Sequence, residues 1–306
     1  MFDAKVVLDS VSPSGVRLTT MEWTYPRFIH SEIMTHRDRA RNAASSRAIP
    51  WPKMMQRISD DPVVPLVFGM EKPGMQTGEP LPKHLADFAN KLWMEARDEA
   101  LALADCLHNI GRTYYEEHKD LLAFEFSKED IDQLMATKIH KSIPNRITEP
   151  WMWITVVMTA TDWNNLFRQR CHPDAEIHFQ KIAGMAREAL VASTPTELGY
   201  GDWHLPYITE ADRQSYNIEM LKKASVARCA RVSYMTHGGE ADIEKDQALF
   251  ERLVTGSGFG HWSPHEHVAR PAVKPTQRSG PFRGWIQLRK AFANECADET
   301  TPIVSE

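Results

Sequence analysis

Cysteines are few in this sequence, and they form no ligand or disulfide pattern. Only four occur among 306 residues, and no two make a CxxC pair; they are Cys106, Cys171, Cys229 and Cys296. This usage disfavours a disulfide framework and a structural zinc site. It is typical of reduced thiols, so we expect a cytoplasmic protein.

The sequence also lacks a long apolar run and an excess of positive charge. No stretch approaches the length of a membrane span, and the first residues lead into a strand-like run and not into a signal sequence. The formal net charge is −5, with 42% hydrophobic and 25% charged residues. These values are ordinary for a globular protein of one large or two modest domains. We therefore expect no membrane and no nucleic-acid partner.

No nucleophile-and-base arrangement stands out, and neither does a metal-binding motif. Residues 260–267 read GHWSPHEH and contain three imidazoles, but there is no HExxH helix and no carboxylate or thiol at ligand spacing. His265 and His267 would share one face of an extended strand. Half of a metal site is one interpretation. Buried or ligand-contacting histidines are the interpretation we favour, so we expect no metal.

The most informative segment covers residues 36–47. It places four arginines, a histidine, an asparagine and two serines within twelve positions. The preceding residues 25–34 predict a helix with Pro26 in its first turn and one apolar face. Guanidinium forks, amides and hydroxyls held after such a helix suit a phosphate or another planar anion. A solvated basic surface is the alternative.

The rest of the sequence predicts a mixture of strands and helices. Alternating β-branched residues predict a strand over 16–24, and the Pro-, Gly- and Met-rich residues 49–82 predict a long loop. Periodic apolar residues predict helices over 83–117, 128–140, 151–170, 173–192, 216–231, 241–254 and 281–293. Residues 193–215 predict a connector and residues 264–274 a strand. We expect an α+β fold with a small antiparallel sheet and long helices.

A second polar patch lies in residues 227–234. Arg228 and Arg231 are three positions apart, on one face of the expected helix, and Ser233 follows them. Ser233 is either a ligand-contacting residue of this patch or only a cap at the end of the helix.

These segments together resemble the flavin-dependent thymidylate synthase family. The signature of that family is an Arg-His-Arg triplet followed by a spaced serine, Asn-Glu, serine and arginine. The matching positions here are Thr35, His36, Arg37, Asn42, Ser45 and Arg47. The ARVS segment of the family is similar to residues 230–233, and its GHxTPxEH segment to residues 260–267. A family helix with an asparagine and, five residues later, an arginine is similar to residues 159–170, with Asn165 and Arg170.

The order of these segments differs from that of the family. ARVS and GHxTPxEH precede the triplet in the family but follow it here, so the chain resembles a circular permutation, which domains tolerate when their termini lie close together. Residues 283–295 are similar to the same helix and motif a second time, in degraded form, with Leu288 in place of the histidine. We expect residues 1–192 and 216–306 to form two halves of one globular unit, joined by the connector 193–215.

Three residues depart from the family pattern. Thr35 replaces the first arginine of the triplet, Ala40 the first serine, and Ala43 the glutamate after Asn42. Two explanations for the missing glutamate stay open: Glu295 of the second copy supplies the carboxylate, or the pyrimidine substrate differs.

The resemblance implies reductive methylation of deoxyuridine monophosphate (dUMP) at C5. Methylenetetrahydrofolate supplies the carbon, reduced FAD the hydride, and NADPH restores the flavin. No protein nucleophile is required, which agrees with a sequence rich in fixed cations. The family assembles as a homotetramer, so we expect a homo-oligomer, with a tetramer favoured.

The resemblance also implies a role for each matching residue. Arg170 and Arg47 are expected to be catalytic. The expected cofactor-binding residues are His36, Arg37, Asn42, Asn165, Ser233, His261 and Ser263. The expected residues for the pyrimidine deoxynucleotide monophosphate are Glu32, Ser45, Arg47, Arg170 and Glu295. Plain structural roles are the alternatives, with Asn165 as a surface residue and Arg170 as a complement to a helix dipole.

Two other functions are compatible with the sequence. A flavin- and folate-dependent enzyme that acts on another pyrimidine nucleotide, or that transfers a hydroxymethyl group, would account for Thr35 and Ala43. A relative that binds nucleotides or RNA without catalysis would account for the arginine cluster and the altered triplet.

Overall fold

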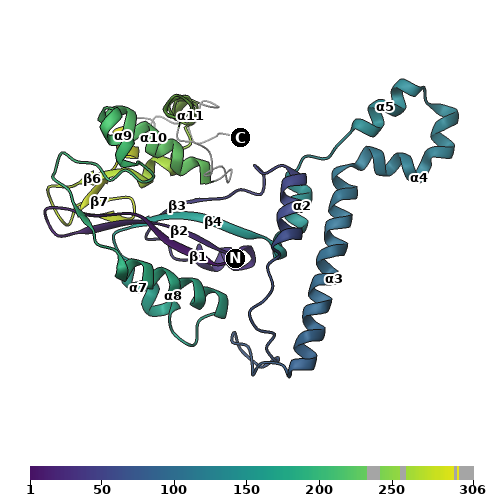
Figure 1. Cartoon of the computed structure of the whole chain (residues 1–306), viewed down its shortest axis with the longest axis horizontal. Helices are drawn as coiled ribbons and strands as arrows, with labels where there is room; N and C mark the ends of the chain where they lie inside the picture. Colours follow the sequence, from purple (N-terminus) through teal and green to yellow (C-terminus); the bar gives the residue numbers. More distant parts are fainter. Residues whose placement is uncertain (233–241, 256–259, 293–294, 296–306) are drawn as a thin grey trace, which may run out of the picture.

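The computed structural model describes residues 1–232, 242–255, 260–292 and 295. It confirms the expected α+β class: a five-stranded sheet lies between two helical layers, and a helical arm projects to one side (Figure 1). The strand order is β3-β4-β2-β1-β5, antiparallel except between β1 and β5. The strands are β1 (Asp3–Val11), β2 (Arg17–Pro26), β3 (Ala40–Ala43), β4 (Trp153–Ala160) and β5 (Thr196–Glu197).

The two faces of this sheet carry different side chains, because alternate residues of a strand point to opposite sides. On one face, apolar residues such as Trp23 and Val156 pack on α8 (Ile177–Ala192) in the largest core cluster. The short helix α7 (Asn164–Arg170) lies on the same side (Figure 1). The other face is polar at Thr20 and Thr159, which are both fully buried.

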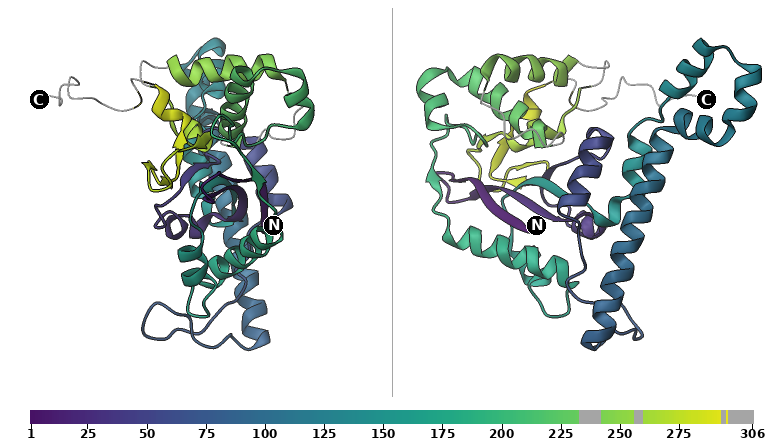
Figure 2. Two further views of the ribbon diagram at one scale, coloured as in Figure 1. Left: turned by 90° about the vertical axis from the view of Figure 1, so that its left-hand side faces the viewer. Right: turned by 45° about the vertical axis from the view of Figure 1, so that its right-hand side comes forward.

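The C-terminal part of the chain covers this polar face (Figure 2). Its elements are α9 (Glu210–Ser215), α10 (Ile218–Arg231), α11 (Ile243–Thr255), η5 (Ser263–His267), β6 (Ala269–Pro271), β7 (Arg278–Ser279), β8 (Phe282–Arg283), β9 (Trp285–Gln287) and η6 (Leu288–Ala291). Its strands form two short antiparallel ladders, in which β6 pairs with β9 and β7 pairs with β8. The sheet therefore separates an α7–α8 layer from a C-terminal layer.

A long helix and two shorter ones form the projecting arm (Figures 1 and 2). The helix predicted over 83–117 is divided at Asn109 into α3 (Lys83–His108) and α4 (Ile110–Glu125). The next helix, α5 (Lys128–Ala136), begins as expected after Ser127, which forms a capping box with Asp130. The remaining short elements are η1 (Arg27–Ile29), α1 (His30–Ile33), α2 (Trp51–Asp60), α6 (Ser142–Ile147) and η2 (Glu149–Trp151).

The helix predicted over 151–170 is wrong for most of its length. Trp153–Ala160 is the strand β4, and only Asn164–Arg170 is helical. Both faces of β4 are largely buried, so its sequence WITVVMTA forms a continuous apolar run without the alternation of a half-exposed strand. Periodicity cannot separate such a strand from a buried helix, whereas its β-branched residues favour the strand.

The helix predicted over 281–293 is also wrong. This segment forms β8, β9 and the 3-10 turn η6, and Gly284 between the two strands has a positive φ of 72°. A left-handed backbone angle ends any helix and is readily adopted by glycine. The resemblance of residues 283–295 to a second copy of the helix and motif therefore does not extend to helical structure.

Four smaller predictions need correction. Residues 49–82 contain the helix α2 before the loop, and the helix predicted over 25–34 is reduced to η1 and α1 because residues 25 and 26 complete β2. The strand predicted over 264–274 is β6 alone, so His265 and His267 lie in η5 and share no strand face. The connector 193–215 contains β5 and α9.

Candidate functional site

Four of the predicted site residues line one polar cavity on the α7–α8 side. His36 and Arg37 come from the loop after α1, and Asn165 and Arg170 from α7. The cavity has a volume of about 370 Å³. Its other lining residues are Thr35, Asp38, Arg39, Asp162 and Gln169. Because α7 directly follows β4, and β3 pairs with β4, the sheet brings these two segments together.

A hydrogen bond joins the two segments inside this cavity. Nε of Arg170 donates to Nε2 of His36 at 2.8 Å. Burial and the nearby guanidinium groups of Arg39 and Arg170 lower the pKa of His36 to about 4, so its ring is neutral and can accept this bond at neutral pH. Phe179 of α8 lies beneath both, with the Arg170 guanidinium 4.7 Å from its ring centroid. Arg170 is thus held by two residues and does more than complement a helix dipole.

Arg39 also lines this cavity, although it is not among the predicted site residues. Its side chain is only 5% exposed, and its guanidinium carbon lies 5.1 Å from the ring centroid of Trp163. Nε and Nη1 are buried and have no hydrogen-bond partner among the described residues. Burial lowers the pKa of Arg39 to about 10. Within the 36–47 cluster, no sequence signal distinguishes it from Arg41, which donates to the carbonyl of Met34.

A second cavity adjoins the first at Thr35 and Arg170, which line both. Its volume is about 570 Å³, and its walls include Glu32 of α1, Glu176 before α8 and residues 75–77 of the loop before α3. Burial, and the negative charge of Glu176, raise the pKa of Glu32. Five predicted residues therefore line two adjoining cavities; they are Glu32, His36, Arg37, Asn165 and Arg170.

Two further predicted residues meet on the opposite, C-terminal side of the sheet. Asn42 of β3 donates from Nδ2 to the carbonyl of Cys229 at 2.8 Å. Ser263 of η5 donates from Oγ to Oδ1 of Asn42 at 3.2 Å. The strand β3 thus contacts the segment that resembles GHxTPxEH, and it contacts Cys229, which directly precedes the segment that resembles ARVS. It does so on a different face from the cavity, because Asn42 pairs with Val157, whose side chain points away from α8.

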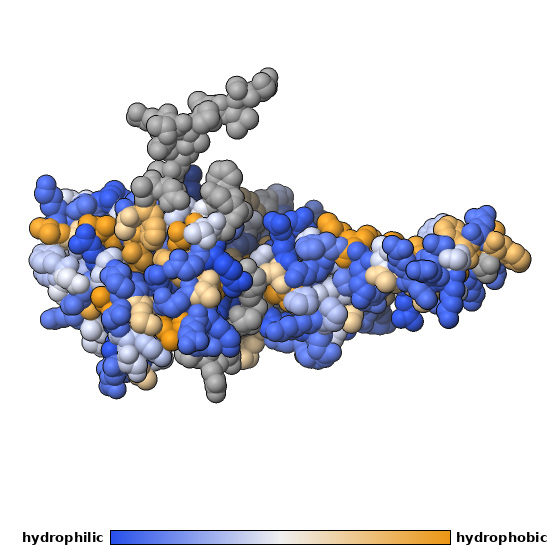
Figure 3. Space-filling view, turned by 90° about the horizontal axis from the view of Figure 1, so that it is seen from above, coloured by the Kyte–Doolittle hydropathy of each residue, from blue (hydrophilic) through white to orange (hydrophobic). Residues whose placement is uncertain are grey.

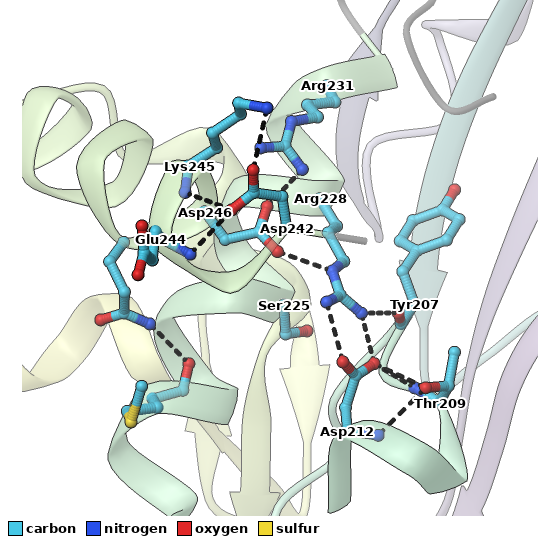
Figure 4. A network of polar contacts seen from close by, with 12 residues as sticks. Tyr207, Thr209, Asp212, Ser225, Arg228, Arg231, Asp242, Glu244, Lys245 and Asp246 are labelled. Carbon is cyan, nitrogen blue, oxygen red and sulfur yellow. Dashed lines mark hydrogen bonds and ion pairs between the residues drawn. The ribbon is translucent and has the colours of Figure 1, made fainter. Parts of the chain in front are cut away.

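A buried ion-pair network fixes the end of α10 that presents the Cys229 carbonyl (Figure 4). Arg228 donates to Asp212 of α9 at 2.6 Å and to Asp246 of α11 at 2.9 Å. Arg231 pairs with the same Asp246, as the shared helix face predicts. Hydrogen bonds from Arg228, and from the backbone of Thr209, hold the pKa of Asp212 well below its usual range. These arginines therefore have structural partners and do not point to a ligand.

Buried histidines link the sheet to the C-terminal layer. His204 hydrogen-bonds Ser10 through Nδ1 and Thr20 through Nε2, each at 2.8 Å. Thr20 continues to Thr159 at 2.7 Å, and Thr159 to Nδ1 of His267 at 2.8 Å. Burial lowers the pKa of His204 and of His267 to about 3, so both rings are neutral at neutral pH. This agrees with the interpretation of buried histidines.

The other predicted residues lie outside both cavities. Ser45 and Arg47 occupy a turn after β3, and the Arg47 side chain is exposed. His261 is exposed before η5. Glu295 accepts from Arg289 at 2.6 Å and from Lys290 at 2.5 Å. Ser233 lies outside the described residues.

Three structural observations concern other kinds of site. No group of three potential ligand side chains for a metal occurs among the described residues. In the same part of the chain, no helix has the length and apolar character to cross a bilayer. Cys106, Cys171 and Cys229 are free thiols, and Cys296 lies outside the described residues.

Comparison with protein-family models and with curated proteins finds no match to this sequence. Function is therefore inferred from the residues and their geometry.

Proposed function

We propose that this protein is an FAD- and methylenetetrahydrofolate-dependent enzyme that methylates dUMP at C5 to form thymidylate. One observation carries the proposal. The segments that resemble the flavin-dependent thymidylate synthase family are far apart in the sequence, yet they contact one another around β3. His36, before β3, meets Arg170, and Asn42 within β3 meets Ser263 and Cys229, the residue before the ARVS-like segment. A permuted chain that keeps the fold of this family requires these segments to meet, here on the two faces of the sheet.

The residues of the first cavity fit the phosphate groups of a nucleotide or dinucleotide. Guanidinium groups from Arg37, Arg39 and Arg170 line it, together with the amide of Asn165. When bound, FAD would supply the hydride that reduces the transferred carbon. The expected holders of FAD in this cavity are His36, Arg37 and Asn165, and Arg170 is expected to bind the pyrimidine nucleotide. The Asn42–Ser263 pair lies on the other face of the sheet, outside this cavity.

The residues of this chain would bind and orient the pyrimidine and stabilise charge on it. Arg170 is suited to this task because His36 and Phe179 fix its guanidinium group in place. A preorganised cation stabilises a developing anion without a reorganisation cost. No side chain needs to attack the substrate.

We also propose that the active form is a homo-oligomer, as in the related family. Arg47 and His261 lie outside the cavities of a single chain, so a second copy is needed to bring such residues to one site. An exposed apolar stripe on α3 suits this contact. Leu85, Phe88 and Leu92 recur at helical spacing with side chains 45%, 55% and 48% exposed. Figure 3 shows apolar patches on the projecting arm.

A related transfer reaction is the second candidate. Ala43 occupies the position of the family's glutamate, and Glu295 is engaged with Arg289 and Lys290. A different pyrimidine nucleotide, or transfer of a hydroxymethyl group, would account for both observations. A non-catalytic relative that binds nucleotides or RNA is the alternative from another class.

Product analysis tests these functions directly. The purified protein is incubated with FAD, NADPH, methylenetetrahydrofolate and either dUMP or deoxycytidine monophosphate. The mass of the product separates a methyl from a hydroxymethyl transfer, and competition between the nucleotides identifies the substrate. Loss of product from an Arg170→Ala variant is the control for contaminating activity. A protein that takes up FAD but yields no modified nucleotide would contradict the proposal.

A further inference from the structure

The first cavity contains a cation that the rest of the protein leaves unsatisfied. Arg39 is only 5% exposed. Two of its three guanidinium nitrogens, Nε and Nη1, lack a hydrogen-bond partner among the described residues. A buried charge without a partner is costly, so such groups are normally paired or bind a ligand. Asp38 and Asp162 line the same cavity, and their charges favour the charged form of Arg39, but neither forms an ion pair or hydrogen bond with it among the described residues.

The surroundings of Arg39 orient it for an anion. The Trp163 ring packs 5.1 Å from the guanidinium carbon. Nε and Nη1 are closed to solvent, so Nη2 is the nitrogen through which Arg39 can meet a ligand in the cavity. Arg170 uses its Nε for His36 and has no other hydrogen bond among the described residues. Two guanidinium groups in one cavity therefore keep donors for the same ligand.

The charge balance of the cavity favours a phosphate. Arg37, Arg39 and Arg170 contribute three positive charges and Asp38 and Asp162 two negative ones, while His36 is neutral. A carboxylate is satisfied by one bidentate arginine. A phosphate group has more acceptor oxygens and can use forks from several directions.

We infer that Arg39 is a phosphate-binding residue, and that with Arg170 it forms the phosphate site of this cavity. Arg39 occupies no position of the family signature, so the assignment comes from its burial and missing partners. Two sources share this chemistry: the phosphate of a nucleotide monophosphate and the diphosphate of FAD. The inference rests on the proposed function only for the identity of these two ligands.

The test compares Arg39→Met with Arg168→Met in the full chain. Methionine keeps the packing of the side-chain stem on Trp163 but removes the charge and the donors. Arg168 is an exposed residue of α7, the helix that also carries Arg170, and it does not line the cavity, so it controls for the loss of one surface charge. Melting temperature is measured in phosphate-free buffer, alone and with inorganic phosphate, dUMP, deoxyuridine or FAD.

We expect Arg39→Met to keep or raise the stability of the free protein but to weaken its binding of phosphate-containing ligands. Without ligand, Arg39→Met melts at the same or a higher temperature than the wild type, because an unpaired buried charge is removed. Its affinity for dUMP or FAD falls by about 10- to 100-fold, the range for hydrogen bonds to a charged group. Binding of deoxyuridine, which has no phosphate, is unchanged. A loss for dUMP alone assigns the monophosphate, and a loss for FAD alone assigns the diphosphate.

Two results would overturn the inference. One is unchanged affinity of Arg39→Met for both dUMP and FAD. The other is a lower melting temperature with unchanged affinity, which would make Arg39 a packing residue. If Arg39→Met does not fold, Arg39→Lys is used in its place, because lysine keeps the charge but lacks the planar fork. Unchanged affinity of Arg39→Lys for both dUMP and FAD would then overturn the inference. Phosphate-dependent binding without product formation would count against the proposed methylation and leave this site standing.

Discussion

Arg170 and His36 are 134 positions apart in the chain and are joined by a hydrogen bond of 2.8 Å. This contact connects the loop that carries the altered triplet to the helix that follows β4. It forms only while His36 is neutral at Nε2, a state that burial and two neighbouring guanidinium groups favour. The pair joins the two segments that line the first cavity.

Replacing Arg170 tests its role in nucleotide binding. We expect Arg170→Ala to weaken dUMP binding by about 10- to 100-fold, since hydrogen bonds to a charged group are lost, while bound flavin is retained. Calorimetric titration with dUMP and the flavin content of the purified variant measure the two effects. Arg168→Ala, on the same helix but outside the cavity, should bind dUMP normally. Unchanged dUMP affinity in Arg170→Ala counts against the assignment.

The buried histidines predict a loss of stability in acid. Burial lowers the pKa of His204 and His267 to about 3, against 6.5 for an exposed ring. Below 6.5 the unfolded chain binds protons that the folded chain excludes, so the free energy of unfolding decreases as pH falls toward 3. The slope is about 1.4 kcal/mol per pH unit for each histidine, and above pH 6.5 these two groups add no slope.

Urea unfolding at a series of pH values measures this slope. His204→Gln removes one of the two groups, so its stability should depend less steeply on pH than that of the wild type between pH 6 and 5. An identical slope in the variant and the wild type would show that His204 is protonated in the folded protein.

The Arg228 network predicts a strong effect on stability. Asp246 is fully buried and pairs with Arg228 and Arg231. Asp246→Ala takes this buried partner from Arg231 and leaves Arg228 with Asp212 alone, so it should lower the free energy of unfolding by about 3–5 kcal/mol. As a control, Glu251→Ala removes the exposed pair with Lys223 and should cost less than about 1 kcal/mol. Chemical denaturation of both variants makes the comparison, and equal losses would be incompatible with the buried network.

The stripe on α3 predicts self-association. Phe88→Glu places a charge in the centre of the stripe and should shift the protein to smaller species in light scattering. Phe124 of α4 is 91% exposed but lies outside the stripe, so Phe124→Glu is the matched control and should leave the mass unchanged. A monomeric wild-type protein, or an unchanged mass for Phe88→Glu, would exclude α3 as the interface.

The sequence predicted elements that carry a clear local signal. Alternating β-branched residues predicted the strand over 16–24, and Ser127 with acidic residues after it predicted the start of a helix, and both are confirmed. It failed at β4, because burial on both faces removes the alternation that marks a strand. On α3, the periodic residue Phe88 is exposed, while Trp93 and Leu101 further along the helix pack in a core cluster, so periodicity alone does not show which face is buried.

The candidate site was predictable in part for similar reasons. Motif spacing identified His36 and Arg170, which the pairing of β3 with β4 brings together. Arg39 could not be identified, because only tertiary packing separates it from the other arginines of the cluster. The sequence also could not show that Asn42 and the cavity lie on opposite faces of the sheet, since that depends on the register of β3.

The visible absorbance spectrum of the purified protein, with and without added dUMP, is the decisive measurement for flavin binding beside a nucleotide. We expect a yellow protein that carries FAD, or takes it up on titration, and a flavin spectrum that changes when dUMP binds beside it. A colourless protein that binds no FAD at any concentration tested would be incompatible with the proposed function.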